Sequence, residues 1–200
     1  MKIIMFGMPG AGKDTHSHML AEVLGIEHFT TGGILRSAAK EDPKLAEFLA
    51  TGQLVNDEMM QEIIENALTF EKEVFCGISY GVKDFILNGY PRNIKQAEFL
   101  HALMEIDAVV FLQVPEEVAM QRLLNRGEGR SDDNEKIIRE RIEVFFTQTL
   151  PIIDFYPRED VIRVDAVGDI QSVGTKILAA LVKHFYAKLI AEEYRCEPRG

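Results

Sequence analysis

The chain has 200 residues, a formal net charge of −10, and a composition that is 46% hydrophobic and 27% charged. A chain of this length and composition is expected to fold as one globular domain with a sizeable core. Its acidic balance argues against binding to a nucleic-acid backbone, so any phosphate ligand must be held by local clusters of Arg and Lys.

Membrane insertion and secretion are also disfavoured by the sequence. No stretch approaches the roughly 20 apolar residues of a membrane span. The apolar run that begins at Lys2 stops at Gly7, which is too short for a signal peptide. Cys76 and Cys196 lie far apart without metal-type spacing and are interpreted as reduced bystander thiols. We therefore expect a cytoplasmic protein with neither a membrane nor a nucleic-acid partner.

The first predicted element is a strand over residues 2–6, and it runs directly into the glycine-rich loop Gly7–Thr15. The spacing from Gly7 to Gly12 and Lys13 fits a phosphate-binding loop. Glycines let backbone N–H groups turn inward around a polyphosphate, and the following helix points its positive end at the same anion. An ordinary glycine-rich turn is the alternative, but the position between a strand and an amphipathic helix favours the phosphate site.

Further along the chain, short apolar runs alternate with segments of helical periodicity. Strands are predicted at residues 2–6, 26–29, 84–87, 108–114 and 161–164. Helices are predicted at residues 16–24, 32–39, 56–68, 94–104, 116–126, 135–156 with a kink at Pro151, and 169–189, and the tail 192–200 is expected to fray. This alternation predicts an α/β fold, a doubly wound parallel sheet with helices on both faces. Ligands of such sheets bind at the carboxyl ends of the strands.

Six arginines in predicted helices and loops are candidate phosphate ligands: Arg36, Arg92, Arg122, Arg126, Arg130 and Arg141. Arg122 and Arg126 lie four residues apart on one helix face, where like charges repel. A bound anion between them explains this pair, and a solvated face with partners such as Glu128 is the alternative. Guanidinium groups suit phosphate oxygens, and phosphoryl transfer needs mainly positioning and charge stabilisation.

Taken together, these segments resemble the adenylate kinase family from residue 1 to about residue 181. The loop is similar to the family's Gly-x-Pro-Gly-x-Gly-Lys-Gly-Thr. The segment Thr30–Arg36 is similar to Ser-Thr-Gly-Asp-x-Leu-Arg, and Asn88–Arg92 followed by Gln96 is similar to Asp-Gly-Phe-Pro-Arg…Gln. A further resemblance, to the family's mobile lid and the arginines that flank it, covers Arg122–Arg126, residues 129–134 and Arg141.

The resemblance implies one kinase domain over residues 1–200. Its parts would be a P-loop core with a five-stranded sheet (1–29, 84–121 and 142–190), a small helical lobe for the nucleoside monophosphate (30–70) and a short lid with its flanks (122–141). Residues 71–83 would be a surface elaboration of that lobe. The implied enzyme is a monomer that transfers phosphoryl groups reversibly from ATP to AMP with Mg²⁺, giving two ADP. Only Gly127-Glu128-Gly129 separate Arg126 from Arg130, so the lid would be very short.

The resemblance also implies residue roles. The expected ATP contacts are Gly10, Ala11, Gly12, Lys13, Asp14, Thr15, Arg122 and Arg126. The expected AMP contacts are Thr31, Arg36, Leu54, Val55, Gly89, Arg92, Gln96, Arg130 and Arg141. The expected catalytic residues are Lys13, Arg92, Arg126, Arg130 and Arg141, with Asp132 and Asp133 steadying the lid. Related uridylate and cytidylate kinases carry Ala and Asn where this chain has Thr31 and Gln96, so AMP is favoured as acceptor. An alternative for Thr31 is the N-cap of the helix at 32–39.

Three residues depart from the family pattern near the metal. Asp14 replaces a Gly, while Gly33 and Asn88 replace carboxylates that, by resemblance, hold water on Mg²⁺. One hypothesis is that Asp14 takes over metal holding; the competing one is that it repels the triphosphate. A uridylate, cytidylate or deoxynucleotide kinase and a nucleotide-sensing module with little turnover remain as alternatives. His16 and His18 are two residues apart on a helix and are not a metal pair.

Overall fold

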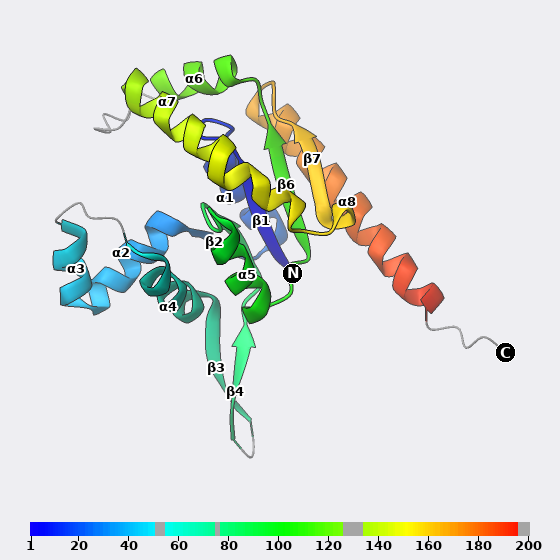
Figure 1. The fold of residues 1–200 in the computed structure, drawn as a ribbon. Helices are drawn as coiled ribbons and strands as arrows, with labels where there is room; N and C mark the ends of the chain where they lie inside the picture. Colours follow the sequence, from blue (N-terminus) through cyan, green and yellow to red (C-terminus); the bar gives the residue numbers. More distant parts are fainter. Residues whose placement is uncertain (51–54, 75–76, 126–133, 196–200) are drawn as a thin grey trace.

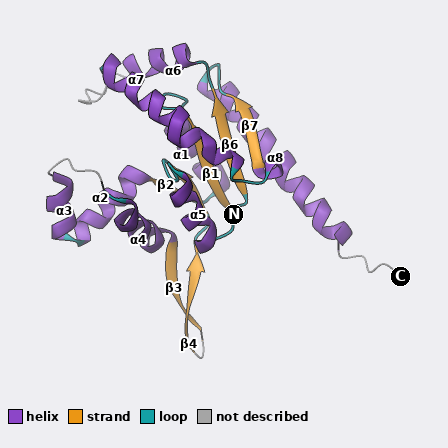
Figure 2. Ribbon diagram, viewed as in Figure 1, coloured by secondary structure: helices purple, strands orange, loops and turns teal. Residues whose placement is uncertain are grey.

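The computed structural model describes residues 1–50, 55–74, 77–125 and 134–195. Its centre is a five-stranded parallel sheet with the order β2-β5-β1-β6-β7 (Figures 1 and 2). The strands are β1 (Lys2–Gly7), β2 (Glu27–Thr30), β5 (Phe85–Asn88), β6 (Ala108–Gln113) and β7 (Val161–Asp165). The fold class predicted from the sequence is confirmed, and each predicted strand is present with its ends shifted by at most one residue.

The central strands are apolar on both faces because helices cover the sheet on both sides. In β1, Ile3, Ile4 and Met5 are each at most 1% exposed. Ile3 pairs with Ile86 of β5 on one side and with Ala108 of β6 on the other. Helix α1 (Lys13–Leu24) packs against α8 (Ile170–Arg195), while α5 (Ile94–Leu103) packs against the short 3₁₀ segment η2 (Leu150–Asp154). Figure 2 shows α1 and α8 on one face of the sheet and α5 on the other.

The remaining helices are α2 (Thr31–Glu41), α3 (Pro43–Ala50), α4 (Asp57–Leu68), α6 (Glu116–Leu124) and α7 (Glu135–Val144). Asn56, Asn93 and Asn134 cap α4, α5 and α7 by accepting a hydrogen bond from the N–H three residues later. The N-cap of α2 is Thr30, whose hydroxyl accepts from the Gly33 N–H at 2.9 Å. The alternative role of Thr31 as this N-cap is therefore wrong, because Thr31 is already the first helical residue.

The long helix predicted over residues 135–156 is divided. The α-helix ends at Val144, a π-helical segment η1 (Phe145–Thr149) follows, and η2 continues from Leu150. A proline blocks the α-helical hydrogen bond to the carbonyl four residues earlier, so regular α geometry cannot continue through Pro151. The irregularity begins before the proline, rather than as a single kink at Pro151. A short 3₁₀ turn, η3 (Arg158–Asp160), precedes β7.

At the edges of the fold, one segment had no predicted element and another differs from its prediction. Residues 71–83 form most of an antiparallel hairpin, β3 (Thr69–Val74) and β4 (Gly77–Val82), which extends away from the sheet in Figure 1. Helix α8 continues to Arg195, so residues 192–195 are helical rather than frayed. Within the described residues, no helix is both long enough and apolar enough to cross a membrane. Cys76 and Cys196 lie outside the described residues.

Candidate active site

A cavity of about 950 Å³ opens at the carboxyl ends of β1, β2 and β5. Its walls come from the glycine-rich loop and the start of α1, from the beginning of α2, from the segment after β5, and from α6 and α7. This is the place where the sequence predicts ligand binding, because the strand order reverses beside β1. Segments far apart in the chain thus line one cavity.

The glycine-rich loop has a backbone that other residues adopt only with strain. Gly10 and Gly12 have φ values of 84° and 90°. A Cβ atom at Gly10 would lie 2.4 Å from the carbonyl oxygen of Ala119, so α6 packs directly on the loop. Gly12 is the N-cap residue of α1, whose N-terminus therefore opens at the cavity. Ala11 is fully buried and does not line the cavity.

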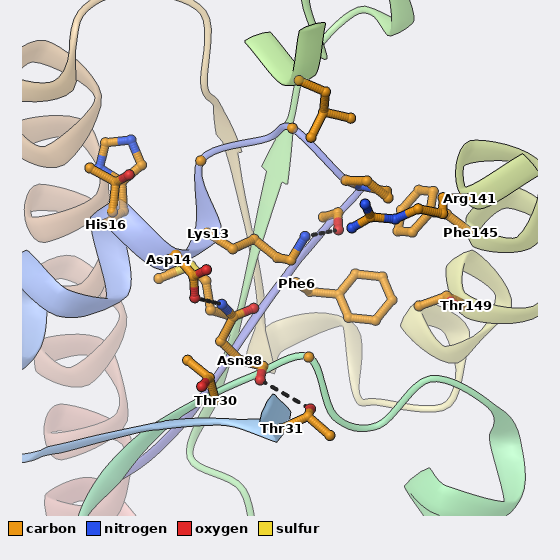
Figure 3. Close-up of a pocket in the computed structure, with 18 of the residues that line it drawn as sticks. Phe6, Lys13, Asp14, His16, Thr30, Thr31, Asn88, Arg141, Phe145 and Thr149 are labelled. Atoms are coloured by element: carbon orange, nitrogen blue, oxygen red, sulfur yellow. Dashed lines mark hydrogen bonds between the residues drawn. The ribbon is translucent and has the colours of Figure 1, made fainter. Parts of the chain in front are cut away.

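Lys13 reaches along the loop into the cavity. Its Nζ donates hydrogen bonds to the carbonyl oxygens of Gly7 and Met8 at 2.8 and 3.0 Å. Figure 3 shows the Lys13 ammonium and the Arg141 guanidinium pointing toward one another from opposite walls. The positive end of α1 lies at the same place. The cavity is therefore suited to a polyanion, although the whole chain is acidic.

Asp14 and Asn88 meet on the wall opposite Arg141. Asn88 Nδ2 donates to Asp14 Oδ1 at 2.6 Å (Figure 3). Asn88 is only 6% exposed, and its Oδ1 has no hydrogen-bond partner among the described residues. A buried amide oxygen beside a carboxylate, at the edge of a phosphate-binding loop, matches the oxygen ligands that Mg²⁺ prefers. The residues present therefore fit a magnesium ion bound together with a nucleotide.

Four of the six candidate arginines line the cavity, namely Arg36, Arg92, Arg122 and Arg141. Arg126 and Arg130 lie outside the described residues, as do Glu128, Asp132 and Asp133. Whether an anion binds between Arg122 and Arg126 therefore stays a prediction. Arg122 Nη2 donates to the carbonyl oxygens of Ala166 and Gly168 at 3.0 and 3.3 Å, which fixes this side chain against the loop after β7.

Arg92 follows the turn after β5. Its Nε donates to the Gly89 carbonyl at 2.8 Å, while its backbone carbonyl accepts from Thr149 Oγ1 at 3.0 Å. Partial burial lowers the pKa of Arg92 from its ordinary value, and the like charge of Arg141 lowers it further. Part of the Arg92 side chain remains exposed to solvent. The proximity of two guanidinium groups is stabilised when an anion lies between them.

Two predicted acceptor residues, Val55 and Gln96, are not among the residues that line the cavity. Val55 packs against the core. Gln96 is 8% exposed; its Oε1 accepts from the Arg92 N–H at 2.8 Å and its Nε2 donates to Asp57 Oδ1 at 2.6 Å. Thr31 and Gly89 line the cavity as predicted, and Leu54 is outside the described residues. Asp57 was not singled out from the sequence, where it is one of many acidic residues near a helix start.

His16 is buried on α1, 4% exposed, and points away from Lys13 in Figure 3. Burial, and then the charge of Arg122, lowers the pKa of its imidazole, so the ring is neutral at physiological pH. His18 lies 3.5 Å from Glu22 on an exposed face. Among the described residues, no group of three His, Cys, Asp or Glu side chains lies close enough together to hold a metal ion.

Comparison with known families decides the assignment. The family model described as adenylate kinase matches residues 5–161. The chain belongs to the adenylate kinase family. An adenylate kinase of Synechococcus sp. (strain WH7803) is 37% identical over 190 residues, covering 90% of this chain and 98% of the relative. Adenylate kinases of Stenotrophomonas maltophilia (strain R551-3) and Phocaeicola vulgatus are 38% and 37% identical, each aligned over 99% of its own length and over 90% and 92% of this chain.

Membership in the adenylate kinase family confirms the resemblance inferred from the sequence. The chain is an enzyme, a nucleoside monophosphate kinase of the phosphotransferase class. The family model covers the chain from within β1, before the phosphate-binding loop, to the start of β7. None of the three relatives carries the name of a uridylate or cytidylate kinase, so the alternative acceptors gain no support.

Proposed function

We propose that this protein transfers the terminal phosphoryl group of ATP reversibly to AMP, with Mg²⁺, to give two ADP. The observation that supports the proposal is one cavity that joins the Lys13 loop to guanidinium groups from four other parts of the chain. An oxygen of the AMP phosphate would attack the γ-phosphorus of ATP. The bond from that phosphorus to the bridging oxygen would break, and ADP would leave. No covalent enzyme intermediate is needed.

On the donor side, the backbone of Gly10–Gly12, together with Lys13, Asp14 and Thr15, would hold the triphosphate. Arg122 would lie beside the donor base, where its bonds to Ala166 and Gly168 already hold it. Glycine-rich loops bind phosphates through backbone N–H groups, which are in place before the ligand arrives. The donor site would thus change little when ATP binds.

On the acceptor side, Arg36 and Arg92 would bind the AMP phosphate, while Thr31, Leu54, Val55, Gly89 and Gln96 would surround its base and ribose. Arg126, Arg130 and Arg141 would gather around the transferring group and stabilise its charge. Lobe 30–70, with its elaboration 71–83, and lid 122–141 would close over the core 1–29, 84–121 and 142–190 and exclude water. We expect a monomer in the cytoplasm, as the resemblance implies.

Magnesium would neutralise charge on the β- and γ-phosphates of ATP. We propose that Asp14 and Asn88 hold it, through the carboxylate and the unpaired amide oxygen. Their pairing at 2.6 Å keeps Asp14 on the wall beside Asn88, where the charge of a bound Mg²⁺ would offset the repulsion between Asp14 and the triphosphate. Asp14 would thus supply a carboxylate near the metal in place of the two family carboxylates that are Gly33 and Asn88 in this chain.

Asp14→Gly tests the metal assignment by a binding measurement that does not require turnover. Calorimetry with ATP alone and with MgATP should show that the variant loses most of the preference for MgATP. If the variant instead binds both forms more tightly by the same factor, Asp14 only repels the nucleotide. If activity matches the parent at every Mg²⁺ concentration and the binding preference is unchanged, Asp14 has no metal role.

A coupled assay for ADP tests the overall function. ADP formation should be fastest with AMP and far slower with UMP, CMP or dAMP as acceptor. Preference for UMP or CMP would identify a different monophosphate kinase. Tight nucleotide binding with negligible turnover would instead identify a sensing module.

A further inference from the structure

We infer that Asp57 determines acceptor specificity by fixing the orientation of the Gln96 side-chain amide. The inference rests on the proposed function, in which Gln96 contacts the acceptor base. Asp57 is the first residue of α4, in the lobe, whereas Gln96 lies in the first turn of α5, on the core. The 2.6 Å hydrogen bond from Gln96 Nε2 to Asp57 Oδ1 joins the two helices.

The two partners of Gln96 permit only one orientation of its amide. A carboxylate is an acceptor only, so the NH₂ group of Gln96 must face Asp57. The Arg92 N–H is a donor only, so the carbonyl oxygen must face Arg92, at 2.8 Å. Turning the amide over would place oxygen against carboxylate and NH₂ against N–H. Both contacts would become repulsive inside a buried site, since Gln96 is only 8% exposed.

Asn93 reinforces this arrangement. Its Nδ2 lies 3.3 Å from both carboxylate oxygens of Asp57, and its Oδ1 accepts from the Gln96 backbone N–H at 3.0 Å. The Asp57 carboxylate also lies near Tyr90, which lines the cavity. Burial raises the pKa of Tyr90 most, and the negative charge of Asp57 raises it further. Asp57 is therefore held in place by α5 while it holds Gln96.

The fixed amide has one N–H and one oxygen lone pair left for a ligand. Adenine presents an amino donor at position 6 beside the acceptor nitrogen N1. These two groups match the oxygen lone pair and the N–H that the Gln96 amide has left. Hypoxanthine presents a carbonyl acceptor and a ring N–H donor at the same atoms, which matches the amide only after it turns over. Asp57 would therefore favour AMP over inosine monophosphate, because the turned amide is excluded. A site that leaves buried polar groups unpaired rejects a ligand strongly.

The experiment compares AMP with inosine monophosphate as acceptors for the parent enzyme, Asp57→Ala, Gln96→Ala and the double variant. Asp57→Ala should reduce the ratio of kcat/KM for AMP to that for inosine monophosphate about tenfold, mainly through the KM values, as expected for a lost charge-assisted hydrogen bond. Asp57→Asn, which can keep an oxygen toward Gln96, should recover part of the ratio. In the Gln96→Ala background, removing Asp57 should have no further effect on the ratio.

Glu58→Ala provides a matched control, since Glu58 is exposed in the same helical turn. A fall in thermal stability with an unchanged ratio in Asp57→Ala would overturn the inference and leave Asp57 a purely structural link. An equal loss of the ratio in Glu58→Ala would also overturn it, since any charge on that turn would then suffice. If Gln96→Ala itself leaves the ratio unchanged, the base contact in the proposed function is wrong, which is a separate failure.

Discussion

The two sides of the cavity are built in different ways. On the donor side, positive-φ glycines and the start of α1 form a backbone cradle, against which α6 packs so closely that a Cβ at Gly10 would meet Ala119. On the acceptor side, hydrogen bonds between side chains join separate elements, as Asp57, Asn93 and Gln96 do between α4 and α5. The cradle lies within one stretch of sequence, whereas the network depends on the tertiary fold.

This difference predicts how each side responds to change. A backbone cradle is rigid and tolerates little alteration, because its geometry depends on glycine. A side-chain network can be altered one bond at a time, and its members adjust. Binding of the polyphosphate should therefore depend on the glycine positions, whereas acceptor choice should depend on single side chains.

The largest effect should come from Lys13→Met. Loss of the only full positive charge that the cradle itself supplies should lower kcat by about 10²–10³-fold, since charge stabilisation of the transferring group is lost. The KM for AMP should change little. Steady-state kinetics with both substrates varied will measure this, with Lys95→Met, an exposed lysine on α5, as the control. A variant that retains most of its kcat would show that the cradle backbone alone suffices.

The matching change on the acceptor side is Arg92→Ala. It should lower kcat/KM for AMP by about 10²-fold, because a guanidinium fork to a phosphate is lost. The affinity for ATP, measured by calorimetry, should stay within a factor of two or so. Arg92→Lys should recover only part of the loss, since an ammonium group cannot make two parallel bonds. Full recovery by Lys would mean that charge alone matters on this side.

Gly10→Ala and Gly89→Ala compare the two sides at glycines with similar positive φ, 84° and 86°. The Cβ added at Gly10 would meet backbone atoms of Ala119 at 2.4 Å, but at Gly89 it would meet the Thr31 hydroxyl at 2.7 Å, and that side chain can rotate. Gly10→Ala should lower the free energy of unfolding by about 3 kcal/mol and Gly89→Ala by about 1–2 kcal/mol. Urea denaturation measures both. Equal losses would contradict the greater rigidity of the donor side.

The smallest effect concerns His16, a buried residue of α1 on the donor side. The pKa of His16 in the folded chain is lower than its unfolded value near 6.5. As the pH falls through this range, the unfolded chain therefore binds a proton at His16 more readily than the folded chain does. Stability should therefore fall as pH drops from 7.5 toward 5.5, by at most about 1.4 kcal/mol per pH unit for this group. His16→Gln should flatten that part of the profile. His28, whose pKa is also lowered, remains in both proteins, and an unchanged slope would contradict the prediction.

The sequence predicted the sheet well because parallel strands covered on both faces leave apolar runs, as in Ala108–Gln113. The hairpin β3–β4 was not predicted, because the charged start of residues 71–83 leaves no continuous apolar run like those of the central strands. Helix α3 was missed although Asp42 precedes Pro43, a helix-start signal: Asp42 Oδ1 accepts from the N–H groups of Lys44 and Leu45 at 2.9 and 3.3 Å.

In the candidate site, too, residues that are close in sequence could be predicted, and contacts between distant residues could not. The loop around Lys13 could be predicted because its residues are contiguous and their spacing reflects one local structure. The bond between Asp57 and Gln96 could not, because 39 residues separate them and only the packing of α4 on α5 brings them together. The pairing of Asn88 with Asp14 across 74 residues is of the same kind.

The π-helical segment η1 has a consequence for how Arg141 is aimed. One extra residue in a helical turn rotates the preceding helix by about 100° and displaces it by about 1.5 Å relative to the following one. Arg141 can therefore face the cavity while Ile152 and Ile153 remain in the core. Deleting one of the exposed residues of η1, such as Thr147, would turn Arg141 away from the cavity relative to Ile152 and Ile153. The length of this one helical turn thus decides whether a guanidinium group reaches the cavity, although no residue of the turn need contact a ligand.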